Sequence, residues 1–248
     1  MSGHNKWSTI KRKKGAIDAK RSKIFSKIIK DISIAVKEGG PEPDNNPRLR
    51  LAIANAKGVN MPKENITRAI NKAADKDAAS FMEVTYEGYA PNGIAIFIEC
   101  TTDNIQRTVA NIRSYFNKYG GSLGTNGSLA FIFDRKGVFR LPKNEMNQDE
   151  FEMELIDGGA EDISYDDDAI TVTTEMESFG IMMKKLEEMN IEPESAELQR
   201  IPKTTTALDK EAAQKVLKLV DIFDDDDDVQ NVYHNIELTD ELLSELEN

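Results

Sequence analysis

Apolar residues recur at helical spacing in the first part of the chain. From Ser22 they mark one face of an expected helix, which Gly39-Gly40-Pro41 ends because proline cannot continue it. This stripe consists of Ile24, Phe25, Ile28, Ile29, Ile32, Ala35 and Val36. Asn46-Pro47 and Asn60-Met61-Pro62 predict the starts of two further helices, and residues 1–22 are expected to be irregular. Three amphipathic helices with short connections predict a small bundle.

Strand patterns begin at about residue 77. Met82–Tyr89 and Ile94–Thr101 are typical of two strands, and Asn92-Gly93 between them predicts a tight hairpin. A helix follows, capped by Asp103 or Asn104 and running to Tyr119. Ser128–Asp134 is expected to be another strand. The glycine-rich residues 120–128 between them lack the Gly-Lys-Ser/Thr ending of a phosphate loop, so they predict a helix stop and a flexible loop.

A second unit with a similar alternation of strands and helices follows. Its elements are a strand at Gly137–Leu141, a helix at Asn147–Ile156, strands at Asp162–Tyr165 and Ala169–Thr174, a helix at Ser178–Met189 and a strand at Ala196–Ile201. This βαββαβ order is the ferredoxin-like pattern. The remaining segments are a helix at Asp209–Phe223, a strand at Asp228–Ile236 and an acidic helix at Thr239–Leu246.

The predicted fold class is α+β, with an N-terminal three-helix module followed by two α/β (ferredoxin-like) domains, one inserted in the other. The strands at 82–134 are too few to close a sheet alone, so we expect the C-terminal segment to complete it. The predicted domains are residues 1–77, residues 78–134 plus 203–248, and the inserted residues 135–202. The alternative is an independent C-terminal appendage.

Charge is distributed unevenly. The whole chain carries 32 Lys and Arg and 44 Asp and Glu, a net charge of -12. Residues 1–76 hold 18 of the basic and 7 of the acidic residues, a net of +11, which leaves -23 on the remainder. Such asymmetry predicts that the N-terminal part binds a polyanion, most simply nucleic acid, while the acidic part repels it and orients docking.

The predicted contacts lie on a basic arm and on one face of the first helix. They are Lys6, Trp7, Lys11, Arg12, Lys13, Lys14, Lys20, Arg21, Lys23, Lys27 and Lys30. Lysine and arginine neutralise phosphates, and Trp7 could stack on an unpaired base or, alternatively, anchor its own segment by packing. The alternative for the whole surface is pairing with the protein's own acidic domains.

Sequence-specific reading of DNA is not indicated by any clear helix-turn-helix motif. The third helix offers basic and amide side chains, and the residues around the start of the second helix are alternative contacts. These two sets are Lys63, Asn65, Arg68, Asn71 and Lys72, and Asn45, Asn46, Arg48 and Arg50. Binding dominated by the phosphate backbone is therefore the expectation, with the second and third helices serving largely as support.

Other chemistry finds little support in the sequence. Asp224–Asp228 lacks the spacing of a calcium loop and predicts a solvated turn, with weak Mg²⁺ or Ca²⁺ binding as the alternative. The single cysteine, Cys100, and two histidines form no catalytic or metal motif, so neither an enzyme nor a cofactor is expected. We expect no membrane segment, no secretory signal and no small-molecule substrate, and a cytoplasmic location.

Several segments together resemble the YebC/PmpR family. The opening Gly3-His4-Asn5-Lys6-Trp7 and the basic residues after it carry the most specific likeness. Three further blocks agree in order: Asn60-Met61-Pro62-Lys63 with Ile66, Tyr86-Glu87-Gly88-Tyr89 through Gly93, and Gly120-Gly121 through Phe133 with Lys136-Gly137. The resemblance implies a three-domain fold and a regulatory role linked to nucleic acid. That role is either DNA-binding regulation of transcription or, alternatively, translational activation on ribosomal or transfer RNA, in the cytoplasm or, for a eukaryotic source, the mitochondrial matrix.

Overall fold

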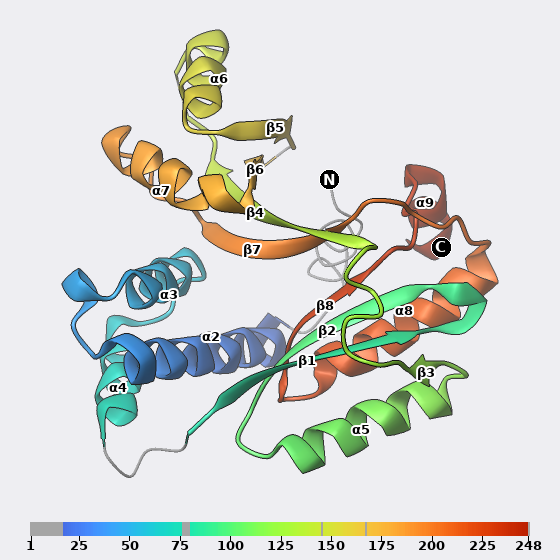
Figure 1. The fold of residues 1–248 in the computed structure, drawn as a ribbon. Coiled ribbons are helices and arrows are strands. Elements are labelled where there is room, and N and C mark those ends of the chain that lie inside the picture. The colour runs from blue at the N-terminus through green and yellow to red at the C-terminus, as the bar shows by residue number, and fades with distance from the viewer. Residues whose placement is uncertain (1–16, 76–79, 145, 167, 248) are drawn as a thin grey trace. The chain divides into compact units, whose positions relative to one another are not determined.

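The computed structural model describes residues 17–75, 80–144, 146–166 and 168–247 (Figure 1). By their tertiary contacts these residues form two units. One contains the described residues of 1–27, 79–134 and 201–248, and the other contains those of 28–78 and 135–200. The three predicted domain boundaries remain a prediction. No helix among the described residues is long and apolar enough to cross a bilayer.

Helices make up the N-terminal part of the described chain. They are α2 (Ile17–Gly39), the short 3₁₀ helix η1 (Pro43–Asn45), α3 (Pro47–Gly58) and α4 (Lys63–Ala74). The prediction of an irregular segment up to residue 22 is wrong from Ile17 onward, since alanine and lysine there favour a helix. The predicted apolar stripe is also imperfect, because Ile29 is exposed whereas Ser33 and Ile34 are buried.

The first sheet has the strand order β3-β1-β2-β8. Its strands are β1 (Met82–Tyr89), β2 (Ala95–Thr102), β3 (Ser122–Leu123) and β8 (Val229–His234). The predicted hairpin is confirmed: β1 pairs with β2, and Asn92 and Gly93 take left-handed backbone angles in the turn. β8 pairs antiparallel with β2, so the C-terminal segment supplies an edge strand to this sheet.

Two helices cover one face of this sheet, α5 (Ile105–Lys118) and α8 (Lys210–Asp225) (Figure 1). Ile96 and Ile98 of β2, Phe116 of α5 and Phe223 of α8 belong to one buried cluster, to which the final helix α9 (Asp240–Glu247) adds leucines. Phe97 points to the opposite face, where it packs with Phe133. Alternation along β2 thus builds a core on each face of the sheet.

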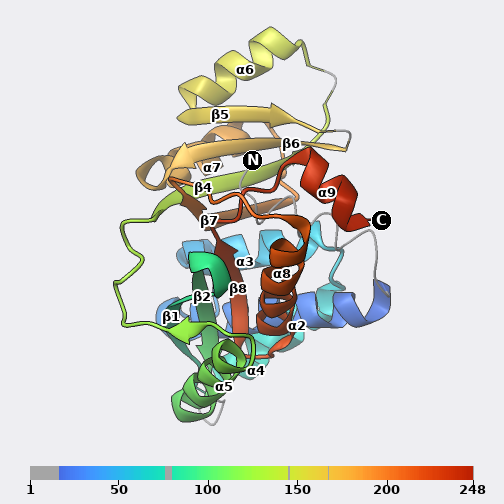
Figure 2. The same cartoon turned by 90° about the vertical axis from the view of Figure 1, so that its right-hand side faces the viewer.

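The second sheet has the order β5-β6-β4-β7, which is the ferredoxin-like arrangement (Figure 2). Its elements are β4 (Phe133–Pro142), α6 (Gln148–Asp157), β5 (Ala160–Tyr165), β6 (Ala169–Glu175), α7 (Phe179–Glu188, after the 3₁₀ turn η3, Met176–Ser178) and β7 (Ser195–Pro202). Phe139, Phe151, Val172 and Leu186 share its core. The predicted α+β fold class is confirmed.

Helix α3 is docked on this second sheet. The Asn55 side chain donates to the Ala196 carbonyl at 3.1 Å and accepts from the Ala196 N–H at 2.9 Å, as a neighbouring strand does. Gly58 allows the close approach, because a Cβ there would overlap the Glu194 carbonyl. α3 is thus held by hydrogen bonds between the Asn55 side chain and the Ala196 backbone, as well as by apolar packing of Leu51.

The predicted strand at Ser128–Asp134 is wrong over its first five residues. The glycine-rich loop before it is bonded to the rest of the sheet through Glu87. Residues 127–132 form turns, and two of their N–H groups bond to the buried carboxylate of Glu87. Gly127 N donates to Glu87 Oε1 at 2.7 Å, and Leu129 N donates to Oε2. A charged acceptor that takes these N–H groups removes them from strand pairing, so the segment turns.

Candidate nucleic-acid interface

The predicted basic arm lies outside the described residues. This holds for Lys6, Trp7, Lys11, Arg12, Lys13 and Lys14, and also for the side chain of Lys20. The described remainder of the predicted surface is Arg21, Lys23, Lys27 and Lys30 on α2. Arg21 is exposed, and its guanidinium carbon lies 5.3 Å from the centre of the Phe25 ring.

Lys23 and Lys27 contact the acidic C-terminal segment. Lys23 Nζ lies 2.7 Å from Asp225 Oδ1 and 3.0 Å from the Asp225 carbonyl oxygen. Lys27 Nζ donates to the Gln230 carbonyl at 2.9 Å, and Gln230 Nε2 donates back to the Lys27 carbonyl at 3.2 Å. Pairing with the protein's own acidic part, the alternative considered from the sequence, therefore occurs at this end of α2.

The Lys23–Asp225 pair is exposed, with 41% and 67% of the two side chains accessible to solvent. Exposed pairs of this kind contribute about 0–1 kcal/mol. A phosphate could therefore replace Asp225 as the partner of Lys23 at little cost. The two interpretations of this surface, internal pairing and polyanion binding, are thus energetically compatible.

The residues around the start of α3 have structural partners. Asn46 is buried, and its side chain accepts from Leu49 N at 3.0 Å and donates to the Ala35 carbonyl at 2.7 Å, which makes it the N-cap of α3. Arg48 pairs with Glu38 at 2.7 Å. Arg50 donates to two carbonyl oxygens of η1. The prediction of Asn46 as a nucleic-acid contact is wrong, because a buried cap cannot reach a ligand.

Helix α4 presents a polar face of a different kind. Ile66, Ala69 and Ala73 are buried on its inner side. The outer side exposes Lys63, Glu64, Thr67, Arg68, Asn71 and Lys72. Within the described part of the chain, Lys63, Arg68 and Lys72 have no carboxylate within ion-pair distance. Their charges are thus directed to solvent.

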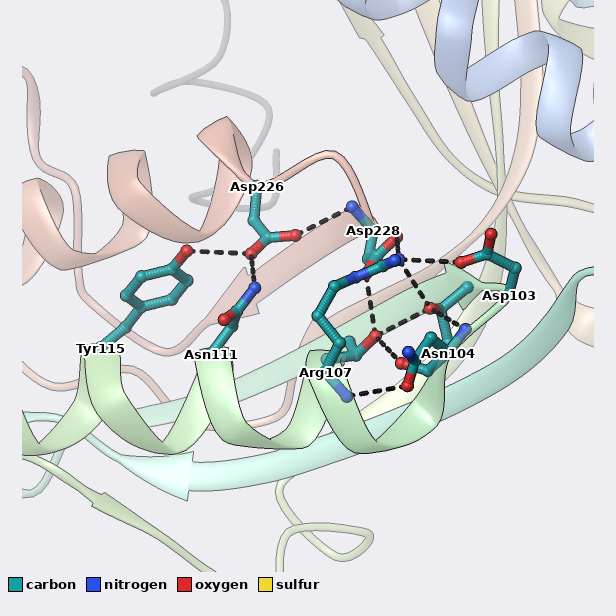
Figure 3. Close-up of polar contacts among 9 residues, drawn as sticks. Asp103, Asn104, Arg107, Asn111, Tyr115, Asp226 and Asp228 are labelled. Atoms are coloured by element: carbon teal, nitrogen blue, oxygen red, sulfur yellow. Dashed lines mark hydrogen bonds and ion pairs between the residues drawn. The ribbon is translucent and has the colours of Figure 1, made fainter.

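The acidic run Asp224–Asp228 is only partly solvated, and the prediction of a solvated turn is wrong for two of its residues (Figure 3). Asp228 is buried and accepts from Arg107 Nη2 at 2.8 Å and from Thr108 Oγ1 at 2.9 Å. Asp226 accepts from Asn111 Nδ2 at 3.2 Å and from Tyr115 Oη at 3.0 Å. These bonds tie the α8–β8 connection to α5, so the carboxylates have a structural role.

The contact with Asp226 also affects the pKa of Tyr115. Partial burial, together with the hydrogen bond to Asp226, raises the pKa of the Tyr115 hydroxyl from 10.0 to about 12. Both effects disfavour the phenolate, the first by desolvation and the second because the bond needs the phenol proton. Spacing within the run could not reveal these partners, although an aspartate just before the apolar Val229 is a weak signal of burial.

Cys100 and His234 are both buried. Over the residues that the structure describes, no group of three His, Cys, Asp or Glu side chains is placed to hold a metal ion.

Two family models together match almost the whole chain. One, described as the TACO1/YebC protein N-terminal domain, matches residues 5–76, and the other, described as the TACO1/YebC second and third domain, matches residues 81–236. The boundary between them coincides with the change from net positive to net negative sequence.

Similar proteins agree with these matches. A probable transcriptional regulatory protein from Amoebophilus asiaticus is 51% identical over 95% of this chain and 98% of its own. Another, from Geotalea uraniireducens, is 49% identical over 99% of this chain and 100% of its own. The crystal structure of a conserved hypothetical protein from Aquifex aeolicus has a TM-score of 0.82 and 42% identity, covering 92% of this chain and 95% of that one.

Proposed function

Because the chain belongs to the TACO1/YebC family, we propose that it is a transcriptional regulator that binds DNA through its basic N-terminal module. The names of the relatives support the regulatory role. The single observation that carries DNA binding is the charge division, +11 on residues 1–76 against -23 on the rest. A module of that charge on a chain of opposite sign favours a polyanionic partner.

The proposed contact begins with the arm. Lys6, Lys11, Arg12, Lys13 and Lys14 neutralise phosphates and release condensed counterions, which supplies affinity without reading sequence. The contact continues along Arg21, Lys23 and Lys27 of α2, where phosphates replace the exposed partner Asp225. Trp7 stacks on a base where one is unpaired. The acidic remainder repels DNA and thereby orients the protein on it.

Binding to a DNA duplex at several salt concentrations tests this proposal. If about 6 phosphates are contacted, log K should fall with log salt at a slope near -5. Replacing Lys11, Arg12, Lys13 and Lys14 together by alanine should abolish measurable binding while the circular dichroism spectrum stays unchanged.

A matched control removes four positive charges from the acidic part of the chain. The lysines for this purpose are Lys184, Lys210, Lys215 and Lys218. This control should keep affinity within about threefold, because its charges lie outside the proposed contact. A flat salt dependence of the unaltered protein, or equal losses in both variants, would refute DNA binding by the basic module.

A further inference from the structure

We infer that the exposed face of α4 is a second DNA-contacting surface, which binds the backbone phosphates of a duplex through Lys63, Arg68 and Lys72. The inference rests on the proposed function and extends it to a part of the module that the sequence had assigned mainly to support. The occupant is duplex DNA, chosen by charge complementarity and by the regulatory names of the relatives.

The seven cations from Lys37 to Lys72 fall into two groups. Lys37, Arg48, Arg50 and Lys57 each bond to an oxygen of the protein itself, such as that of Glu192 for Lys57. Among the residues described, the three cations of α4 do not. Internal bonds therefore account for the first group of cations, whereas the α4 group remains available to bind a ligand.

The position of Lys63 strengthens this view. It is the first residue of α4, where the partial positive charge of the helix dipole disfavours a cation. A residue that breaks such a local rule without an internal partner is more readily explained by function than by stability. An approaching phosphate would be attracted by Lys63 and by the helix dipole together.

The dimensions of the face also fit a duplex. From Lys63 to Lys72 the helix rises about 13.5 Å, at about 1.5 Å per residue. Nine residues make about two and a half turns, so Lys63 and Lys72 project from opposite flanks of the exposed side, toward phosphates on the two sides of a major groove about 12 Å wide. Arg68 and Asn71 lie between them in sequence and are also exposed. The opposite face holds α4 in place through Ile66 and Ala69.

The first test replaces Lys63, Arg68 and Lys72 together by alanine in the full chain. Loss of three phosphate contacts should weaken binding to a DNA duplex on the order of a hundredfold at 0.1 M salt, and should make the salt slope shallower by about 2.7.

The matched control is the triple replacement of Lys210, Lys215 and Lys218 by alanine on α8. It removes the same charge from a helix that likewise carries three basic residues but has an acidic surplus. Affinity should stay within about twofold of the unaltered protein, since these lysines lie outside the proposed surface. Equal weakening by both triple replacements would overturn the inference, because only net charge would then matter.

A second test remains informative if the triple replacement fails to fold. Glu64 is the second residue of α4 and lies on the exposed face, so Glu64→Gln removes a repulsion and should tighten binding about threefold to tenfold. Glu211→Gln is its counterpart, because Glu211 is the exposed second residue of α8 and loses the same helix-dipole interaction. It should leave affinity unchanged, and an equal effect of both replacements would overturn the inference.

The outcomes separate this inference from the proposed function. If the arm variant loses binding while the α4 triple variant keeps full affinity and slope, the α4 surface is refuted and the proposed function stands. If the unaltered protein shows no salt-dependent binding, the proposed function itself fails. Binding that depends on α4 with an A-form RNA duplex and is absent with DNA would overturn the choice of DNA.

Discussion

Replacing Asp228 by alanine removes the carboxylate that joins α5 to the start of β8. Its oxygens accept from Arg107 Nη2 at 2.8 and 2.9 Å, from Arg107 Nε at 3.2 Å and from Thr108 Oγ1 at 2.9 Å. Breaking a buried ion pair by removing one partner costs about 3–5 kcal/mol. The cost here should be lower, since 47% of the Arg107 side chain is exposed to water and Thr108 keeps its contacts with Thr102 and Asn104. We expect a loss of about 2–4 kcal/mol in the free energy of unfolding.

Urea unfolding of the full chain, followed by circular dichroism, measures this loss. Asp225→Ala is the matched control from the same acidic run, and it should cost less than about 1 kcal/mol because its pair with Lys23 is exposed. A double-mutant cycle of Asp228→Ala with Arg107→Met should give a coupling energy of about 1–2 kcal/mol. Equal costs at Asp225 and Asp228, or no coupling between Asp228 and Arg107, would show that the network of Figure 3 does not stabilise the fold.

Two further predictions concern stability. The pKa of Tyr115 is raised in the folded state from 10.0 to about 12. Its contribution to the free energy of unfolding is therefore complete below pH 10 and is lost as the pH rises to about 12. Between pH 10 and 12 the Tyr115→Phe variant should therefore lose less stability than the unaltered protein, as measured by urea unfolding at fixed pH. An equal loss in both proteins would contradict this cause of the pKa shift. Asn55→Ala removes two hydrogen bonds to the backbone of Ala196 and should cost about 1–3 kcal/mol by thermal unfolding. A melting temperature unchanged from that of the unaltered protein would show that α3 is held by packing alone.

Local sequence patterns predicted most secondary structure. The βαββαβ order of residues 133–202 and the turn at Asn92-Gly93 depend on periodicity and on backbone preferences of single residues, and both are confirmed. The cap residue Asn104 was likewise predicted, because capping involves neighbours only three positions apart. The failure at Ser128–Ile132 has the opposite cause, since the partner that turns this segment is Glu87, about forty residues away.

The charge division that supports DNA binding was determined by the sequence alone, because a sum of charges needs no coordinates. Only the tertiary structure decided which charges have internal partners. Asp228 and Arg107 are 121 positions apart, and Lys23 and Asp225 are 202 apart, so no local pattern could pair them. The same folding that provides partners for the cations around α3 leaves those of α4 directed to solvent, and this contrast locates the proposed second contact surface.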